Sequence, residues 1–315
     1  MSNETEYPEA VDVVGYNYTE DRYDKDHAAY PERIIYGSEN GLSRDAWLAV
    51  RDKDFIFGQF VWTGTDYLGE SRNWPSRGLG SGLLDFGSLP KPRGYFRASM
   101  WSESPVTYIG TYPIQSRRQG QVPLSTDAPD VWNYALEQKI RVVCYTNAPQ
   151  ARLLLNNKQI GEMKPYDDRS GIICWDIPFR PGTLKAEGCD KDGKVLSEYS
   201  ITTSGRPYAI RATADKTVLS KDKATAHITV TVLDENGVMV KLADNNITCT
   251  VEGPARLLGL EGADNTDMGD YRDNKQRVYN GRLLAYIQTT GEAGEITVSF
   301  TSPLLEGTQV KLNAE

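Results

Sequence analysis

Histidine is scarce in this sequence, which has only His27 and His227 among 315 residues. A metal centre built mainly from imidazole ligands is therefore not expected. The sequence has four cysteines, Cys144, Cys174, Cys189 and Cys249. They lack the paired spacing of a zinc site, and each stands in or beside a strand-like run. We predict buried free thiols, with one disulfide as the alternative, and we expect neither a metal nor another cofactor.

Long apolar runs and concentrated positive charge are also missing. No stretch of about 18 apolar residues occurs, so the sequence predicts no membrane-spanning helix. The formal net charge is −8 and the basic residues are dispersed, which argues against nucleic acid as a partner. The first ten residues, MSNETEYPEA, are polar and contain no apolar core of a secretory signal.

The remaining composition is that of a folded protein with more than one domain. Apolar residues make up 39% and aromatic residues 10% of the chain, which is enough to form buried cores. Residues 1–105 alternate apolar runs with helical patterns, as a parallel α/β sheet does. Residues 106–205 and 206–315 consist of short strands separated by turn residues, which is typical of β-sandwiches. We therefore predict a mainly β protein, with two Ig-like sandwiches behind an incomplete α/β segment.

Several polar and aromatic side chains stand where predicted strands of residues 1–105 end. Glu39 follows the apolar run Ile34–Tyr36, and Asn17 and Tyr18 end the preceding strand. Trp62 and Asp66 follow the next strand. The carboxyl ends of parallel strands share one edge, where α/β barrels hold their catalytic groups. A carboxylate near tyrosine and tryptophan suits a sugar, because indole stacks on a pyranose and a carboxylate can attack or stabilise an oxocarbenium-like centre.

Four motifs in this region resemble glycoside hydrolase family 2, the β-galactosidase family. They are DVVGYNY, RIIYGSENG, FGQFVWTGTDYLGE and GSGLLDFGSLPKPRGYFRASMW. The resemblance implies that residues 1–105 form the last three strand–loop units of a (β/α)8 barrel. It implies that Glu39 is the catalytic nucleophile, that Tyr18 hydrogen-bonds it, and that Trp62 forms the floor of the sugar site. Asn17 and Asp66 are further candidates for substrate binding.

The resemblance continues beyond residue 105. KIRVVCYTNAPQARLLLNNKQIG is similar to the sandwich that follows the barrel in many bacterial members. VTVLDENGVMVKLADNNITCTVEGPARLLGL resembles the Ig-like domain that often closes such chains. The parent enzyme is therefore expected to be bacterial, and periplasmic or secreted.

The family's second catalytic carboxyl group has no match here. A retaining glycosidase needs two carboxyl groups about 5–5.5 Å apart. The family's acid/base lies in an Asn-Glu pair after the fourth barrel strand, and the only such pair here is Asn3 with Glu4. No apolar strand precedes it, and two further strands and helices will not fit between it and Glu39. We expect a C-terminal piece of a larger β-galactosidase-like enzyme, inactive alone.

Three alternatives and one assembly prediction follow. A non-catalytic sandwich module could bind carbohydrate through Trp132, Trp175 or Tyr208, although strands usually bury such residues. A β-mannosidase or a β-glucuronidase is also possible. A glucuronidase should carry an Asn-x-Lys clamp, and FGSLPKPRG has Lys91 without that asparagine.

An incomplete sheet leaves an open edge and apolar faces, which predicts self-association through residues 1–105, with residues 106–125 as an alternative cover.

Overall fold

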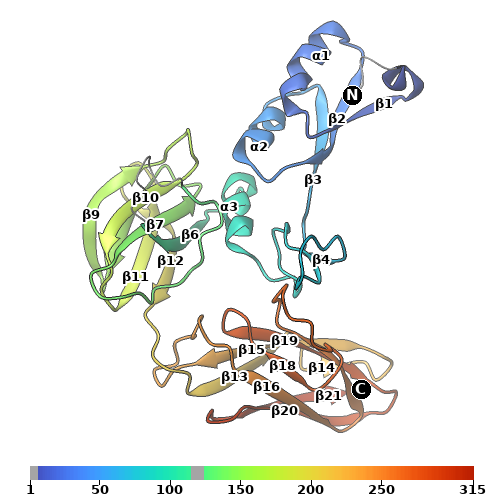
Figure 1. Ribbon diagram of the computed structural model, residues 1–315, viewed down its shortest axis with the longest axis vertical. Coiled ribbons are helices and arrows are strands. Elements are labelled where there is room, and N and C mark those ends of the chain that lie inside the picture. The colour runs from blue at the N-terminus through green and yellow to red at the C-terminus, as the bar shows by residue number, and fades with distance from the viewer. Residues whose placement is uncertain (1–5, 115–123) are drawn as a thin grey trace.

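The computed structural model describes residues 6–114 and 124–315, so Asn3 and Glu4 lie outside the described residues. Three regions follow one another along an elongated molecule (Figure 1). The elements of the first region are η1 (Tyr7–Ala10), β1 (Val13–Asn17), η2 (Glu20–Arg22), α1 (Tyr23–Ala29), β2 (Ile34–Asn40), α2 (Arg44–Arg51), β3 (Ile56–Val61), β4 (Tyr67–Leu68), β5 (Gly78–Leu79) and α3 (Pro92–Trp101).

The strands β1, β2 and β3 form a parallel sheet in that order. Helix α2 begins after Ser43, whose hydroxyl accepts a hydrogen bond from the Ala46 N–H at 3.1 Å, as an N-cap does. One core joins α1 and α2 to the sheet, so both helices cover the same face (Figure 1). The alternation of strands and helices predicted from the sequence is confirmed.

The other face of this sheet is uncovered, in line with the apolar faces expected of an incomplete sheet. Strands apolar throughout are usually buried on both faces, but Val13, Ile34, Phe57 and Phe60 are exposed. Tyr36 stacks on Phe57 at 5.3 Å and meets Phe60 edge-on. These five side chains, here called the open face, form an apolar surface. Apolar composition alone does not reveal which face has a cover.

The second region is a sandwich of two antiparallel sheets, ordered β10-β7-β6 and β12-β11-β8-β9. Trp132 and Trp175 are buried in its core, as the sequence predicted. Asn156 and Asn157 make the hairpin between β8 and β9 with positive φ values of 51° and 63°, a backbone that asparagine tolerates. The strands are β6 (Thr107–Pro113), β7 (Lys139–Thr146), β8 (Gln150–Leu155), β9 (Lys158–Pro165), β10 (Ile173–Pro178), β11 (Thr183–Cys189) and β12 (Val195–Thr202).

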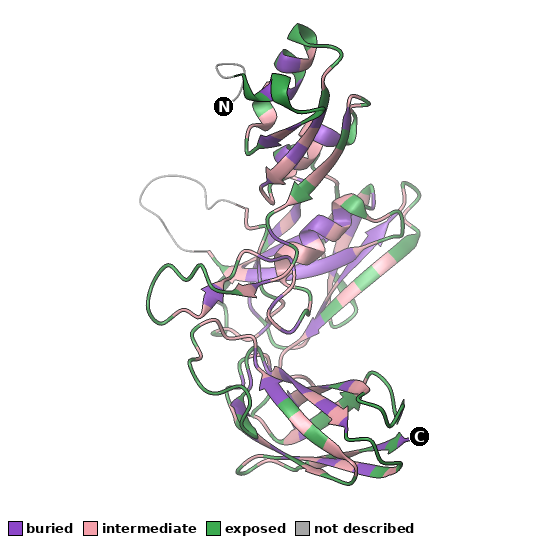
Figure 2. Cartoon of the chain, turned by 90° about the vertical axis from the view of Figure 1, so that its right-hand side faces the viewer, coloured by how far each residue is buried: buried purple, intermediate pink, exposed green. Residues whose placement is uncertain are grey.

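The third region is a second sandwich, with sheets ordered β13-β15-β19-β17 and β14-β21-β20-β16-β18. Burial alternates along its strands, most regularly in β15, which places one side of each sheet in the core (Figure 2). The strands are β13 (Ala209–Ala214), β14 (Val218–Leu219), β15 (Thr225–Leu233), β16 (Asn246–Glu252), β17 (Ala255–Glu261), β18 (Lys275–Arg277), β19 (Arg282–Thr289), β20 (Gly294–Thr301) and β21 (Thr308–Ala314). The mainly β fold class is confirmed.

Helix α3 packs against the first sandwich. Phe96 of α3 is buried in one cluster with Tyr108 and Tyr145 of strands β6 and β7. The ring of Tyr95 stacks on that of Tyr108 at 4.5 Å. The segment after β3 therefore reaches from the sheet to the sandwich through α3.

All four cysteines are free thiols, three of them buried and Cys174 half-buried. In the described ranges no helix is long and apolar enough to cross a membrane. Within the same ranges no group of three or more His, Cys, Asp or Glu side chains could hold a metal ion.

Candidate active site

The ends of β1 and β2 bring Tyr18 and Glu39 together. The parallel register pairs Asn17 with Glu39, and the Tyr18 N–H donates to the Glu39 carbonyl oxygen at 2.8 Å. Tyr18 has a φ of 50°, a left-handed backbone that a tyrosine rarely adopts. The Glu39 side chain also interacts with the Tyr18 hydroxyl and contributes to the raised pKa of Tyr18. Backbone and side chain of Tyr18 thus both contact Glu39.

The electrostatics of this pair keep the tyrosine protonated. Desolvation and the hydrogen bond to Glu39 raise the pKa of Tyr18 to about 12. A phenol with this pKa remains a donor throughout the neutral and mildly alkaline range. The Tyr18 hydroxyl therefore stays neutral, and it can donate to the Glu39 carboxylate without placing a second negative charge beside it.

The residue after Glu39 anchors the end of β2. Asn40 is fully buried, and its amide donates to Glu20 at 2.8 Å and to the Tyr23 hydroxyl at 3.0 Å. A Cβ atom at Gly37 would lie 2.0 Å from the Asn40 Oδ1, so only glycine fits there. Sequence analysis missed this support, although Gly37 and Asn40 flank the glutamate in the GSEN motif.

Trp62, which directly follows β3, and Tyr67 of β4 extend the site. The backbone N–H of Trp62 donates to the Asn40 carbonyl oxygen at 2.9 Å, which fixes the tryptophan beside the end of β2. Its ring contacts Tyr67 edge-on at 5.6 Å. Desolvation and a hydrogen bond to Glu70 raise the pKa of Tyr67 to about 12, and the charge of Glu39 adds to this increase. Tyr67 therefore belongs to the same cluster.

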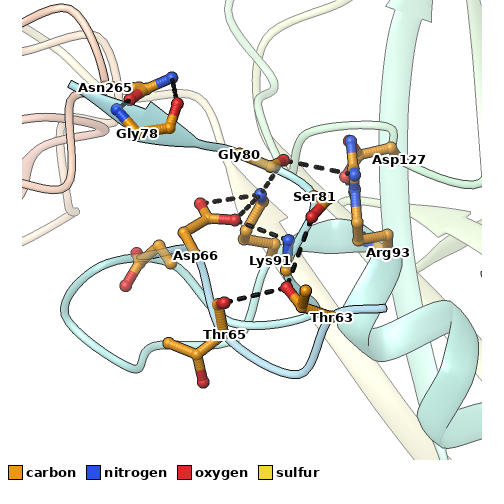
Figure 3. A network of polar contacts seen from close by, with 12 residues as sticks. Thr63, Thr65, Asp66, Gly78, Gly80, Ser81, Lys91, Arg93, Asp127 and Asn265 are labelled. Carbon is orange, nitrogen blue, oxygen red and sulfur yellow. Dashed lines mark hydrogen bonds and ion pairs between the residues drawn. The ribbon is translucent and has the colours of Figure 1, made fainter. Parts of the chain in front are cut away.

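Asn17 and Asp66 differ in their settings. Asn17 ends β1 at the same edge and is exposed, so its amide is available to a ligand. Asp66 is 9% exposed, and both its carboxylate oxygens lie 2.9 Å from the Lys91 Nζ (Figure 3). The Gly82 N–H also donates to it at 2.7 Å. The Asp66 carboxylate is therefore already bound by groups of its own segment, Gly82 and Lys91.

The loop that contains Asp66 is also tied to both sandwiches (Figure 3). The Asn265 side chain of the second sandwich accepts from the Gly78 N–H at 3.0 Å, and Arg93 pairs with Asp127 of the first. A cavity of about 630 Å³ lies at this junction. Its four basic side chains are each paired with a carboxylate: Lys91 with Asp66, Arg93 with Asp127, Lys241 with Asp130, and Arg282 with Asp85. The junction cavity is thus lined by charges that already neutralise one another.

Comparisons with known proteins match each of the two sandwiches to a family model. Residues 210–311 match the model of glycoside hydrolase family 2 C-terminal domain 5, and residues 137–197 match a domain of unknown function, DUF4982. The chain is 34% identical over 270 residues to the beta-galactosidase BoGH2A of Bacteroides ovatus. That match covers 84% of this chain and 29% of BoGH2A.

Two further relatives extend the comparison. A putative beta-glucuronidase of Formosa agariphila is 25% identical, with 81% of this chain and 24% of that protein covered. A crystal structure of a glycosyl hydrolase family 2 member from Bacteroides cellulosilyticus superposes with a TM-score of 0.90 at 27% identity. It covers 100% of this chain and 44% of that one, so the chain spans less than half of each of these relatives. The chain belongs to glycoside hydrolase family 2.

Proposed function

We propose that this chain carries the nucleophile side of a retaining, β-galactosidase-like active site, with Glu39 as the nucleophile. The observation that carries the proposal is the pairing of Tyr18 with Glu39 at the ends of two parallel strands, where the Tyr18 backbone N–H donates to the Glu39 carbonyl oxygen at 2.8 Å and the two side chains interact. A carboxylate held in this way is oriented toward the strand-end edge, where α/β enzymes bind substrate.

The proposed reaction has two displacements. A Glu39 oxygen forms a bond to the anomeric carbon while the glycosidic C–O bond breaks, and the leaving oxygen takes a proton from a general acid. Water then attacks the anomeric carbon of the glycosyl-enzyme, the bond between that carbon and the Glu39 oxygen breaks, and the water gives up a proton to the same residue acting as a base. Tyr18 holds the carboxylate in position, and the Trp62 ring and the Asn17 amide would contact the sugar.

The general acid is proposed to lie outside this chain. Glu20 and Glu70, two carboxylates near the site, already accept hydrogen bonds from Asn40 and Tyr67. General acid–base assistance contributes about 10²–10⁴-fold to such a rate. We therefore expect no measurable hydrolysis of an ordinary β-galactoside by this chain alone. If the isolated chain hydrolyses an activated aryl galactoside and Glu39→Gln abolishes that activity, the proposal that the chain lacks the general acid would be contradicted.

A neutral sugar suits the structure better than a glucuronide. Recognition of a uronic acid requires a free cation, and Lys91 was the sequence candidate for that role. The Lys91 Nζ is bound by both oxygens of Asp66 and by the Gly80 carbonyl oxygen at 2.9 Å. We therefore favour a β-galactoside. A non-catalytic sugar-binding sandwich is disfavoured because Trp132 and Trp175 are buried, which leaves Tyr208, 39% exposed, as the single exposed aromatic residue of the three candidates.

The nucleophile can be tested in a hybrid protein. In this hybrid the chain replaces the segment of BoGH2A that it matches, and hydrolysis of an aryl galactoside is measured. Glu39→Gln should lower kcat by about 10⁴-fold or more, the range seen when a catalytic nucleophile is removed. Glu70→Gln is the matched control and should retain most of the activity. A Glu39→Gln hybrid that keeps a tenth of the wild-type kcat would contradict the proposal.

A further inference from the structure

A pocket with a volume of about 300 Å³ lies where α2 and α3 meet the first sandwich. The pocket is separate from the strand-end site, because Tyr18, Glu39 and Trp62 do not line it. One face of α2 forms a wall, since its lining residues are spaced three and four positions apart. The lining residues used below are Arg44, Trp47, Leu48 and Arg51 of α2, Met100 of α3, and Ala148 and Tyr166 of the first sandwich.

The charge in this pocket has one sign. Arg44 and Arg51 are basic, and none of the described residues that line the pocket is an aspartate or a glutamate. Arg51 is already neutralised, because its Nε and Nη2 lie 2.8 and 2.5 Å from the two carboxylate oxygens of Asp52. Arg44 is half-buried and has neither a hydrogen bond nor an ion pair within residues 6–114 and 124–315. The Arg44 guanidinium is therefore a positive charge for which the pocket supplies no counter-charge.

The Tyr166 hydroxyl lies close to this guanidinium. A Cβ atom placed on Gly171 would be 3.2 Å from the Arg44 Nε and 3.3 Å from the Tyr166 hydroxyl oxygen, so both groups flank the same glycine. Gly171 has a φ of 73°, a backbone that favours glycine, and its missing side chain leaves room for both neighbours. In the part of the chain that the structure describes, the Tyr166 hydroxyl has no hydrogen-bond partner. Two donors without an acceptor thus lie together in the pocket.

We propose that this pocket binds a small organic carboxylate, with the carboxylate on Arg44 and Tyr166 and an apolar, ring-sized body against Trp47 and Leu48. A carboxylate matches the guanidinium because its two oxygens can accept from two guanidinium nitrogens together, and a phenol supplies one more donor. The proposal does not depend on the sugar or on the reaction proposed above.

The lining and the size of the pocket define the body of the ligand. Trp47, Leu48, Met100 and Ala148 present apolar side chains, so a bare inorganic anion would leave most of the lining without a contact. The volume of about 300 Å³ is at the lower end of the range of about 300–1,000 Å³ that small-molecule sites have. A single ring fits this volume better than an oligosaccharide does.

The test is a titration of the chain with 4-fluorobenzoate, followed by the fluorine NMR signal of this probe. A probe of about ten non-hydrogen atoms should bind with a Kd of about 1–10 mM. The neutral 4-fluorobenzamide has nearly the same shape and should bind about tenfold more weakly or not at all, because it cannot pair with the guanidinium. Glucuronate, whose ring is polar, should also bind more weakly than 4-fluorobenzoate.

Substitutions then locate the probe within the chain. Arg44→Gln should raise the Kd of 4-fluorobenzoate by about tenfold or more, Arg44→Lys by less, and Tyr166→Phe by about threefold. Arg51→Gln is the matched control on the same helix face, and it should change the Kd by less than about twofold because Asp52 already neutralises Arg51. Melting temperatures close to that of the wild-type chain show that each variant is folded.

Four results would overturn the proposal. They are no binding of 4-fluorobenzoate, equal binding of 4-fluorobenzamide, tighter binding of glucuronate than of 4-fluorobenzoate, and equal losses of affinity in Arg44→Gln and Arg51→Gln. The last result would show that the probe responds to positive charge in general and not to a seat on Arg44.

Discussion

At the scale of single residues, the contact between Tyr18 and Glu39 has the clearest consequences. Tyr18→Phe removes the hydroxyl donor and leaves the ring. A hydrogen bond to a charged group contributes about 1.5–3 kcal/mol, so kcat of the hybrid should fall by roughly 10–100-fold. Steady-state kinetics with an aryl galactoside measure this loss. Tyr67→Phe is the control, because the Tyr67 hydroxyl donates to Glu70 and not to Glu39.

The pH dependence of the contact between Tyr18 and Glu39 follows from the direction in which the pKa of Tyr18 is shifted. The pKa of Tyr18 is raised to about 12, so the hydroxyl stays protonated as pH increases from 6 to 10. Wild-type and Tyr18→Phe hybrids should therefore show parallel pH profiles of kcat over that range. An alkaline limb near pH 9 that disappears in Tyr18→Phe would contradict the donor role.

At the scale of elements, the pair of Asp66 and Lys91 holds the loop after β3. Both side chains are largely buried, with 6% and 18% exposed. Lys91→Met leaves the Asp66 carboxylate without its cation, so the free energy of unfolding should fall by about 3–5 kcal/mol. Denaturant titration measures this loss in the free energy of unfolding. Asp66→Asn combined with Lys91→Met removes both charges and should recover part of the loss, whereas additive losses would show that the pair is not coupled.

The linker between the two sandwiches depends on another carboxylate. Asp234 is buried and accepts from the backbone N–H groups of Gly205 at 2.6 Å and of Asn236 and Val238 at 2.9 Å. Burial acts against the charged form, but these three donors prevail and lower the pKa of Asp234. The folded pKa lies below the usual value of about 3.9, so this stabilisation is present above pH 4 and is lost as pH falls below it.

Melting temperatures between pH 3 and pH 6 test this contribution. The wild-type chain should lose stability more steeply below pH 4 than Asp234→Asn, whose amide does not titrate. Asp222→Asn is a matched control, because Asp222 is exposed and should leave the slope unchanged. Identical slopes for wild type and Asp234→Asn would contradict the argument.

At the scale of the whole molecule, we propose that the isolated chain associates with a second copy of itself through the open face. Phe57 and Phe60 are 64% and 60% exposed, and an apolar surface of this kind favours burial against a second copy. A symmetric dimer is the commonest closed arrangement. Of the alternative cover, residues 106–125, strand β6 belongs to the first sandwich, and residues 115–123 lie outside the described residues.

Light scattering of the full chain measures this association. We expect a dimer at high concentration, and Phe57→Glu with Phe60→Glu should make the chain monomeric. Leu304→Glu is the control, because Leu304 is a fully exposed apolar residue of the second sandwich. A wild-type chain that stays monomeric would defeat the proposal, and a dimer lost equally in Leu304→Glu would place the contact in the wrong region.

Local features of this protein were determined by the sequence itself. The helical spacing of residues 44–51 and the capping Ser43 are local sequence signals for α2. The turn residues Asn156 and Asn157 are a local signal for a hairpin, since asparagine tolerates positive φ. The parallel strands that end at Asn17 and Glu39 placed the candidate site at one edge, because parallel strands share their carboxyl end.

Only the tertiary structure decided which partners these elements meet. The apolar pattern of β1, β2 and β3 shows that both faces could be buried, but a cover comes from segments distant in sequence. The binding of Asp66 to Lys91, the packing of Phe96 on the first sandwich, and the unpaired donors of Arg97 are likewise long-range outcomes. Periodicity encodes which side chains avoid water, whereas the identity of their neighbours depends on the whole packed chain.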